Sequence, residues 1–241
     1  MLTVMTYNVG AGLAGPLRLV ETLRHSGADI IGLQELAPEQ GAAIGQLLGD
    51  DYPFQALYAT GIPGKGLISR FPLREIELLE LHPGRPDLQA TVLAPGGALA
   101  VIVAHPPPPR IGRHRVRQSA LADRQIAAIA AVATRGQPAV LLTDFNRVGW
   151  QTAYRQLRQS GLIDAFGTAG RGMGFTLPTR LSHLAYRGHP LGEVALPPLL
   201  RVDYVWHTAH FRTLRSWIGG HAGSDHLPVL AELMRIDGVM G

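Results

Sequence analysis

The stretch from Gly223 to Val229 places an acid and a histidine side by side. Asp225 and His226 lie at the start of an apolar run that ends near Leu233 and has the pattern of a buried strand. One backbone turn at the start of a strand can direct both side chains into a cleft. The pair would then supply a metal ligand and a titratable group. A surface turn explains the pair equally well in isolation, so its weight depends on the other strand ends.

Similar polar residues end other apolar runs of the chain: Asn8, Glu35, His105, Asp144, Asn146 and Asp203. A carboxylate at the end of an inner strand, such as Glu35, is costly to desolvate unless it meets a cation. Asp144 and Asn146 flank Phe145, so both can point one way while the ring packs the other way. Taken singly, Asn8 is typical of a turn and Asp203 of a cap.

Oxygen ligands dominate this set, with histidines beside them. Such a set suits Mg²⁺, or Mn²⁺ as a substitute, better than zinc. Magnesium at a phosphate ester polarises the phosphoryl oxygens and stabilises a leaving oxyanion. A histidine held by a carboxylate can work near neutral pH.

Two other chemistries fit the sequence poorly. Ser224 lacks the second glycine of a nucleophile elbow, which argues against a Ser-His-Asp hydrolase. The glycines around Lys65 resemble a P-loop only superficially, because their spacing is wrong and no hydroxyl residue follows the lysine.

The charge balance favours an anionic partner. The chain has 241 residues, a net charge of +4 and a sequence pI of about 9.8. Arg70 follows a strand and is a candidate for the cleft. A second group of arginines surrounds the start of a helix with no acid among them: Arg110, Arg113, Arg115 and Arg117. This group is either a solvated basic face or a phosphate-binding patch beside His105.

The sequence has no cysteine, which excludes disulfides and thiolate metal sites. It shows no signal peptide, no apolar run of membrane-spanning length and no evident protein partner. We therefore expect a cytoplasmic protein that forms a single domain over residues 1–241.

Apolar patterning predicts helices and strands in alternation. We expect helices over 16–26, 38–48, 112–135 and 150–160, and an irregular loop over 167–198. We expect strands over 2–7, 30–33, 67–68, 76–81, 88–93, 99–104, 139–143, 202–206 and 227–233. This pattern fits an α/β protein with two packed sheets and helices outside them.

The order of the short motifs resembles the endonuclease/exonuclease/phosphatase superfamily, the DNase I-like fold. The motifs are Tyr7-Asn8-Val9, Gln34-Glu35, Ser69-Arg70-Phe71-Pro72, His105, Asp144-Phe145-Asn146, Asp203-Tyr204-Val205 and Ser224-Asp225-His226. Each is weak alone, but their order over nearly the whole chain is a strong signal. The resemblance implies a four-layer sandwich of two packed, mainly antiparallel β-sheets flanked by helices, with the site at the rim.

The resemblance also implies roles for these residues. Glu35 would be the principal metal ligand, with Asn8 and Asp225 nearby. Asp144 would position or deprotonate the attacking water, and Asn146 would hold that water or a phosphoryl oxygen. His226, oriented by Asp203, would bind the phosphoryl group or act as the base.

His105 would stabilise the phosphate or help to protonate the leaving group, and water would attack directly without a covalent intermediate. His105 and the prolines after it also resemble a bacterial branch associated with glycopeptide resistance, which has lipid phosphates among its suggested substrates. We expect a Mg²⁺-dependent phosphoesterase that is a DNA nuclease, with a phosphatase for a lipid or other small phosphate as the alternative. A nucleic-acid-binding protein without activity is the least favoured interpretation, because no catalytic position is substituted.

Overall fold

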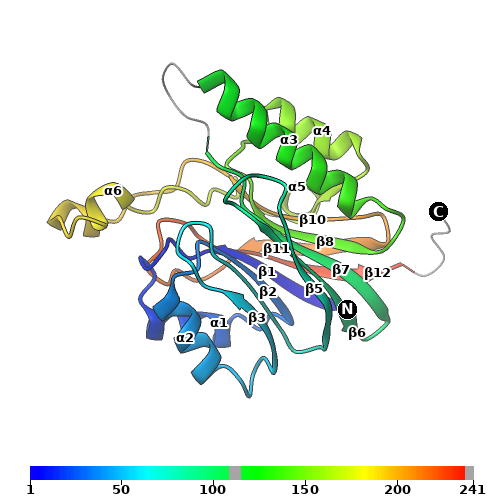
Figure 1. Cartoon of the computed structure of the whole chain (residues 1–241), viewed down its shortest axis with the longest axis horizontal. Helices are drawn as coiled ribbons and strands as arrows, with labels where there is room; N and C mark the ends of the chain where they lie inside the picture. The colour runs from blue at the N-terminus through cyan, green and yellow to red at the C-terminus, as the bar shows by residue number, and fades with distance from the viewer. Residues whose placement is uncertain (109–114, 237–241) are drawn as a thin grey trace.

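A computed structural model describes residues 1–108 and 115–236. Two six-stranded sheets pack face to face, with α1 and α2 covering one outer face and α3 and α4 covering the other (Figure 1). This is the predicted four-layer sandwich. Among the described residues, no helix is both long enough and apolar enough to cross a membrane.

The first sheet has the strand order β11-β12-β1-β2-β4-β3. Its strands are β1 (Leu2–Asn8), β2 (Ile30–Gln34), β3 (Phe54–Tyr58), β4 (Lys65–Ser69), β11 (Phe211–Ile218) and β12 (Val229–Arg235). The helices on its outer face are α1 (Pro16–His25) and α2 (Pro38–Leu47). Both begin at a proline, which suits the first turn because its missing N–H has no partner there.

The second sheet has the order β5-β6-β7-β8-β10-β9. Its strands are β5 (Leu73–Leu79), β6 (Asp87–Ala94), β7 (Gly97–Ala104), β8 (Ala139–Asp144), β9 (Ile163–Asp164) and β10 (Asp203–His207). The helices on its outer face are α3 (Arg115–Ala133) and α4 (Thr152–Gln159). Only the β1–β2 and β7–β8 pairs are parallel among the described strand pairs, so both sheets are mainly antiparallel.

The expected loop over residues 167–198 contains short helices. These are the end of α5 (Ala165–Ala169), then α6 (Ser182–Ala185) and the 3-10 helix η1 (Pro190–Glu193). We call residues 177–200 the arm, because α6 projects beyond the body of the molecule (Figure 1). The remainder of the segment is irregular, as its glycines and prolines predict. The last strand begins at Val229 rather than Leu227.

Gly32 of β2 packs against the facing sheet with no space for a side chain. A Cβ atom on Gly32 would lie 2.7 Å from Cβ of Leu142 and 2.9 Å from Cγ2 of Val103, both on the facing sheet. Interiors packed at this density have no room for an added methyl group. Gly32 therefore sets the spacing of the two sheets whose edges carry the polar residues.

We expect Gly32→Ala to destabilise the protein by about 1–3 kcal/mol through overpacking. Gly45→Ala is the matched control, because its Cβ would meet no atom closer than 3.9 Å and would fall inside helix α2. That change should leave stability unchanged or raise it by up to about 1 kcal/mol. Urea unfolding of both variants tests the difference, and equal stabilities would contradict this account of the packing.

Candidate active site

The strand pairing brings polar residues from both sheets to one edge. Asn8 pairs with Gln34 at the parallel ends of β1 and β2, which places Asn8 beside Glu35. On the other sheet, Asp144 at the end of β8 pairs with Asp203 at the start of β10. An amide–carboxylate hydrogen bond of 2.9 Å, from Nδ2 of Asn8 to Oδ2 of Asp144, joins the two sheets at this edge.

This edge of the two sheets borders a cavity of about 500 Å³. Its polar part is formed by Glu35, Arg85, His105, Asp144, Asn146, Arg180, Ser182, Asp225 and His226. Its apolar part is formed by Ile62, Pro108, Leu177, Pro178, Leu181, Leu200 and the ring of Tyr186. Six of the eight residues predicted at strand ends thus share one cavity. Asn8 and Asp203 contact it through hydrogen bonds to Asp144 and His226.

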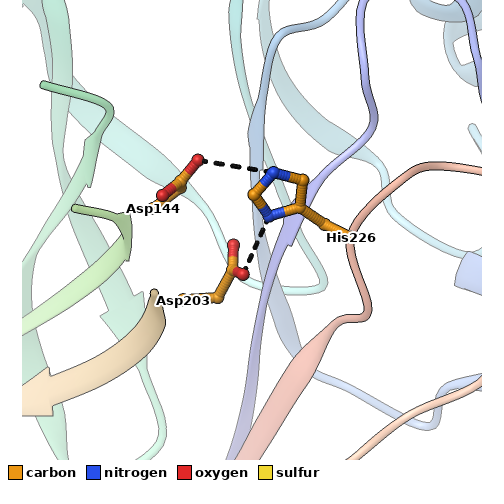
Figure 2. A group of neighbouring side chains, drawn as sticks. All are labelled: Asp144, Asp203 and His226. Atoms are coloured by element: carbon orange, nitrogen blue, oxygen red, sulfur yellow. Dashed lines mark hydrogen bonds and ion pairs between the residues drawn. The ribbon is translucent and has the colours of Figure 1, made fainter. Parts of the chain in front are cut away.

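His226 lies between two carboxylates (Figure 2). Its Nδ1 is 2.9 Å from Oδ2 of Asp203, and its Nε2 is 3.8 Å from Oδ2 of Asp144. Burial alone would lower the pKa of His226, but the charges of Asp203 and Asp144 outweigh burial and raise it to about 10. The imidazole is therefore a cation at neutral pH, with its Nε2–H directed toward Asp144.

The backbone of the Ser224–His226 turn is fixed by Ser224. The Ser224 hydroxyl donates to the carbonyl of Asn8 at 2.7 Å and accepts from the backbone N–H of His226 at 3.1 Å. Ser224 is fully buried. It therefore positions the histidine and is not available as a nucleophile.

Asp144 is the most enclosed carboxylate of the cavity. It accepts hydrogen bonds from Asn8 and from the backbone N–H of Asn146 at 2.8 Å. Burial, followed by the charge of Asp203, raises the pKa of Asp144 to about 7, against the opposing effect of His226. Such a carboxylate can exchange a proton near neutral pH.

Asn146 has a left-handed backbone conformation, with φ of 51°. Its Nδ2 donates to the carbonyl of Pro106 at 3.2 Å, which directs the side chain along the cavity wall. Left-handed φ is uncommon for a residue other than glycine and is found often at functional sites.

Glu35 and Asp225 form the acidic side of the cavity. Burial raises the pKa of Glu35, and the charge of Asp225 raises it further, while the charge of His226 opposes both. Two carboxylates that face one cavity and disfavour each other's charge are stabilised by a divalent cation, and oxygen ligands are those that Mg²⁺ prefers. The carboxylates of Glu35 and Asp225 therefore fit the divalent metal that we expect, and Asn8 beside them is hydrogen-bonded to Asp144 and to the backbone N–H of Gly10.

A second grouping also has ligand spacing. One ligand atom from each of Asp144, Asp203 and His226 lies within 4.8 Å of the others. In that grouping, Asp203 and Nδ1 of His226 already hydrogen-bond to each other. We interpret it as a histidine held by its acid, so Glu35 and Asp225 are the carboxylates that would hold a metal.

His105 reaches both sides of the site. Its Nε2 lies 3.5 Å from Oε1 of Glu35 and 3.5 Å from Oδ2 of Asp144. Burial, with the charges of Lys65 and Arg85, lowers the pKa of His105 well below its usual value. The ring is therefore neutral, and these contacts are those of a neutral imidazole rather than ion pairs.

The arginines predicted for substrate binding are placed differently. Arg70 lies at the opposite end of β2 from Glu35, next to Asp29 and the ring of Tyr52, so the expectation that it reaches the cleft is corrected. The physical reason is that β4 runs antiparallel to β2, so its last residue is far from the end of β2. Arg110 and Arg113, and the side chains of Arg115 and Arg117, lie outside the described residues.

Several residues of the site begin strands and were missed for that reason. Lys65 starts β4 opposite Gln34, is buried, and has a pKa that burial lowers to about 8. Asp87 starts β6 and accepts the backbone N–H of His105 at 3.1 Å. Burial raises the pKa of Asp87 to about 6. A sequence signal could have found them: a strand that pairs antiparallel with a predicted strand begins next to the residue where the predicted strand ends.

The arm also contributes to the cavity and was missed. The start of the arm is hydrogen-bonded to the Ser224–His226 turn, since the backbone N–H of Thr179 donates to the carbonyl of Asp225 at 2.8 Å. Tyr186 donates its hydroxyl proton to the carbonyl of Gly10 at 2.8 Å, so the arm bridges to the loop after β1. Its composition, rich in glycine and proline, gave no signal of a site.

Comparisons with known proteins agree with this geometry. Residues 5–226 match the Endonuclease/Exonuclease/phosphatase family. An endonuclease/exonuclease/phosphatase from Beutenbergia cavernae DSM 12333 is 21% identical, with a TM-score of 0.73 over 97% of this chain and 71% of that chain. An AP endonuclease from Archaeoglobus fulgidus is 16% identical, with a TM-score of 0.72 over 96% of this chain and 99% of that chain.

Sphingomyelinase C from Streptomyces griseocarneus has the same fold, at 17% identity and a TM-score of 0.68 over 95% of this chain and 98% of that chain. No curated protein matched the sequence. Two mainly antiparallel sheets that share a rim of carboxylates and histidines define a phosphoester hydrolase of the DNase I-like class. The chain belongs to the endonuclease/exonuclease/phosphatase family, whose members are phosphoester hydrolases that generally depend on a divalent metal.

Proposed function

We propose that this protein is a Mg²⁺-dependent phosphodiesterase that hydrolyses DNA by direct attack of water. The observation that carries the proposal is the Asp203–His226–Asp144 group, whose His226 and Asp144 line one cavity with Glu35 and Asp225. Glu35, Asp225 and Asn8 would hold the ion. When bound, Mg²⁺ would polarise the phosphoryl oxygens and stabilise the leaving oxyanion.

The protonation state of each side chain determines its proposed role in the reaction. Cationic His226 donates its Nε2–H to a phosphoryl oxygen and so stabilises the charge that develops there. Asp144 accepts the proton of the attacking water as the new P–O bond forms and the bond to the leaving oxygen breaks. Neutral His105 donates a hydrogen bond to the phosphate or to the leaving oxygen. Asn146 holds the attacking water or a phosphoryl oxygen.

DNA is the proposed substrate because of the basic sequence and the arginines around the start of α3. Each phosphate contact releases counterions, with a slope of about −0.9 in log K against log salt on duplex DNA. We expect Arg113→Ala combined with Arg117→Ala to weaken DNA binding and to flatten that slope by up to about 2 units. Turnover at saturating DNA should fall much less.

The matched control removes two arginines that do not line the cavity. Arg24→Ala combined with Arg70→Ala makes the same change in net charge, and these residues, on α1 and after β4, are paired with Asp51 and Asp29. The salt slope of this variant should remain that of the wild type. If the slope is equally unchanged in the Arg113/Arg117 variant, DNA is no longer the favoured substrate.

A phosphatase for a small or lipid phosphate is the second candidate, and the apolar wall of the cavity favours it. Leu177, Pro178, Leu181 and Leu200 of the arm face the carboxylates across the cavity. Arg180 lies in the same wall but is paired with Glu193 at 2.6 Å. Such a wall suits an apolar group attached to the phosphate. Hydrolysis of plasmid DNA against an isoprenyl phosphate, each with and without EDTA, separates the two substrates.

A further inference from the structure

One buried hydroxyl lies between two carbonyl groups just beyond the paired ends of β8 and β10. The phenol oxygen of Tyr204, on β10, is 2.7 Å from the carbonyl oxygen of Arg147 and 2.7 Å from that of Arg201. Tyr204 is 1% exposed. Its single proton can be donated to one carbonyl at a time, so the hydroxyl keeps both within hydrogen-bonding reach.

These two carbonyls belong to the segments that carry catalytic side chains. Arg147 directly follows Asn146, which has the left-handed φ of 51°, and Arg201 precedes Asp203 by two residues. The β8–β10 ladder ends at the Asp144–Asp203 pair. Beyond it, the backbone hydrogen bond from Phe145 to the carbonyl of Val202 and the Tyr204 hydroxyl connect the two segments.

The side chain of Asp203 has few restraints of its own. Its Oδ2 is bound to His226, whereas no group in the described part of the chain hydrogen-bonds its buried Oδ1. The direction in which this carboxylate points therefore depends on the backbone at the start of β10. A shift of that backbone would change the hydrogen bond by which Asp203 orients the His226 ring.

Arg201 fixes the ring of Tyr204 from outside. Its guanidinium lies 4.9 Å from the centre of that ring and 5.6 Å from the ring of Phe166. It is also paired with Oδ2 of buried Asp164 at 2.8 Å. A planar cation that stacks on aromatic rings and pairs with a carboxylate is held in one orientation.

We propose that Tyr204, held by Arg201, is a positioning residue that sets the backbone of Asn146 and Asp203 for catalysis. The inference rests on the proposed phosphodiesterase function. The ring alone would fill the same space in the core, so packing does not require the hydroxyl. Burial raises the pKa of Tyr204 far above its usual value, which keeps the phenol protonated as a donor.

Tyr204→Phe removes this hydroxyl and keeps the ring. Tyr52→Phe is the matched control, because its buried hydroxyl also lies near two carbonyl oxygens, those of Leu23 at 3.3 Å and Ala28 at 3.0 Å, outside the site. With bis(p-nitrophenyl) phosphate and Mg²⁺, we expect Tyr204→Phe to lower kcat by about 10- to 100-fold, as small displacements of catalytic groups do. The KM of Tyr204→Phe should change little, and Tyr52→Phe should keep kcat within about twofold of wild type.

A spectroscopic measurement separates positioning from a merely structural role. The Nδ1–H proton of His226, which bridges to Asp203, should shift or broaden in the NMR spectrum of Tyr204→Phe but not in that of Tyr52→Phe. His226→Asn identifies the resonance. If Tyr204→Phe keeps both the resonance and kcat, the proposal is overturned.

Arg201→Lys provides a second variant if Tyr204→Phe does not fold. It keeps the charge but loses the planar stacking, so kcat should fall and the same resonance should shift. Wild-type kcat and an unchanged resonance in Arg201→Lys would also overturn the proposal. If the wild type hydrolyses neither the diester nor DNA, the proposed function fails, and the NMR comparison still decides whether Tyr204 positions Asp203.

Discussion

Glu35→Gln is expected to remove Mg²⁺-dependent hydrolysis while the fold remains intact. The side chain keeps its size and loses one negative charge at the acidic side of the cavity, next to Asp225. Metal ions supply several kcal/mol of charge stabilisation to phosphoryl transfer, so kcat should fall by about three orders of magnitude. Chelation of the wild type with EDTA should have a comparable effect.

The fold of Glu35→Gln should be preserved because burial and the charge of Asp225 already disfavour ionised Glu35 in the apo protein. Thermal unfolding without metal should therefore show no loss of stability. Isothermal titration with Mn²⁺ measures the lost affinity independently of activity. The control is Glu77→Gln, which makes the same substitution at an exposed position of β5. Near-normal turnover of Glu35→Gln at saturating Mg²⁺ would remove Glu35 from the site.

Asp203→Asn and His226→Asn are each expected to cause a large loss of kcat. In the double variant, the two losses should not multiply. Each should lower kcat by about 10²- to 10⁴-fold, and the double variant should be little worse than the more damaging single change. The reason is that Asp203 acts through His226, with which it shares a 2.9 Å hydrogen bond. Independent losses that multiply in the double variant would show that the two residues do not act as a unit.

The pH dependence of stability gives a second measurement on this pair. The folded-state pKa of His226 is raised to about 10, above the value of about 6.5 expected for an unfolded chain. The protonated ring therefore stabilises the folded state fully below about pH 6.5, and this contribution is lost as the pH rises toward 10. In EDTA, the difference in unfolding free energy between wild type and His226→Asn should be greatest at pH 6 and should shrink toward pH 10.

The sequence was sufficient to find most of the polar residues that share the cavity, because buried strands have a recognisable apolar pattern that ends at a polar residue. An apolar run that ends in a carboxylate or histidine, as at Glu35, His105 and Asp144, identifies a polar group that the fold must bring to an edge. Prolines 16 and 38 likewise predict helix starts that the structure confirms. These signals are local, since they depend on periodicity and on the desolvation of single residues.

The tertiary structure decided which strand ends share an edge. The end of β4 lies far from the end of β2 because the two strands are antiparallel, which removes Arg70 from the site and places the buried Lys65 beside Gln34 near it. No periodicity in the sequence encodes that direction. The arm likewise could not be assigned to the cavity wall from its own composition, because its position also depends on tertiary contacts.

The protonation states were also decided only by the assembled structure. The sequence contains His105 and His226 as equivalent candidates, yet burial lowers the pKa of one and paired carboxylates raise the pKa of the other. The sequence alone thus indicated which polar residues lie at strand ends, and six of them share the cavity. The tertiary structure determined which of them are charged, because charge depends on the desolvation and the neighbouring charges that packing creates.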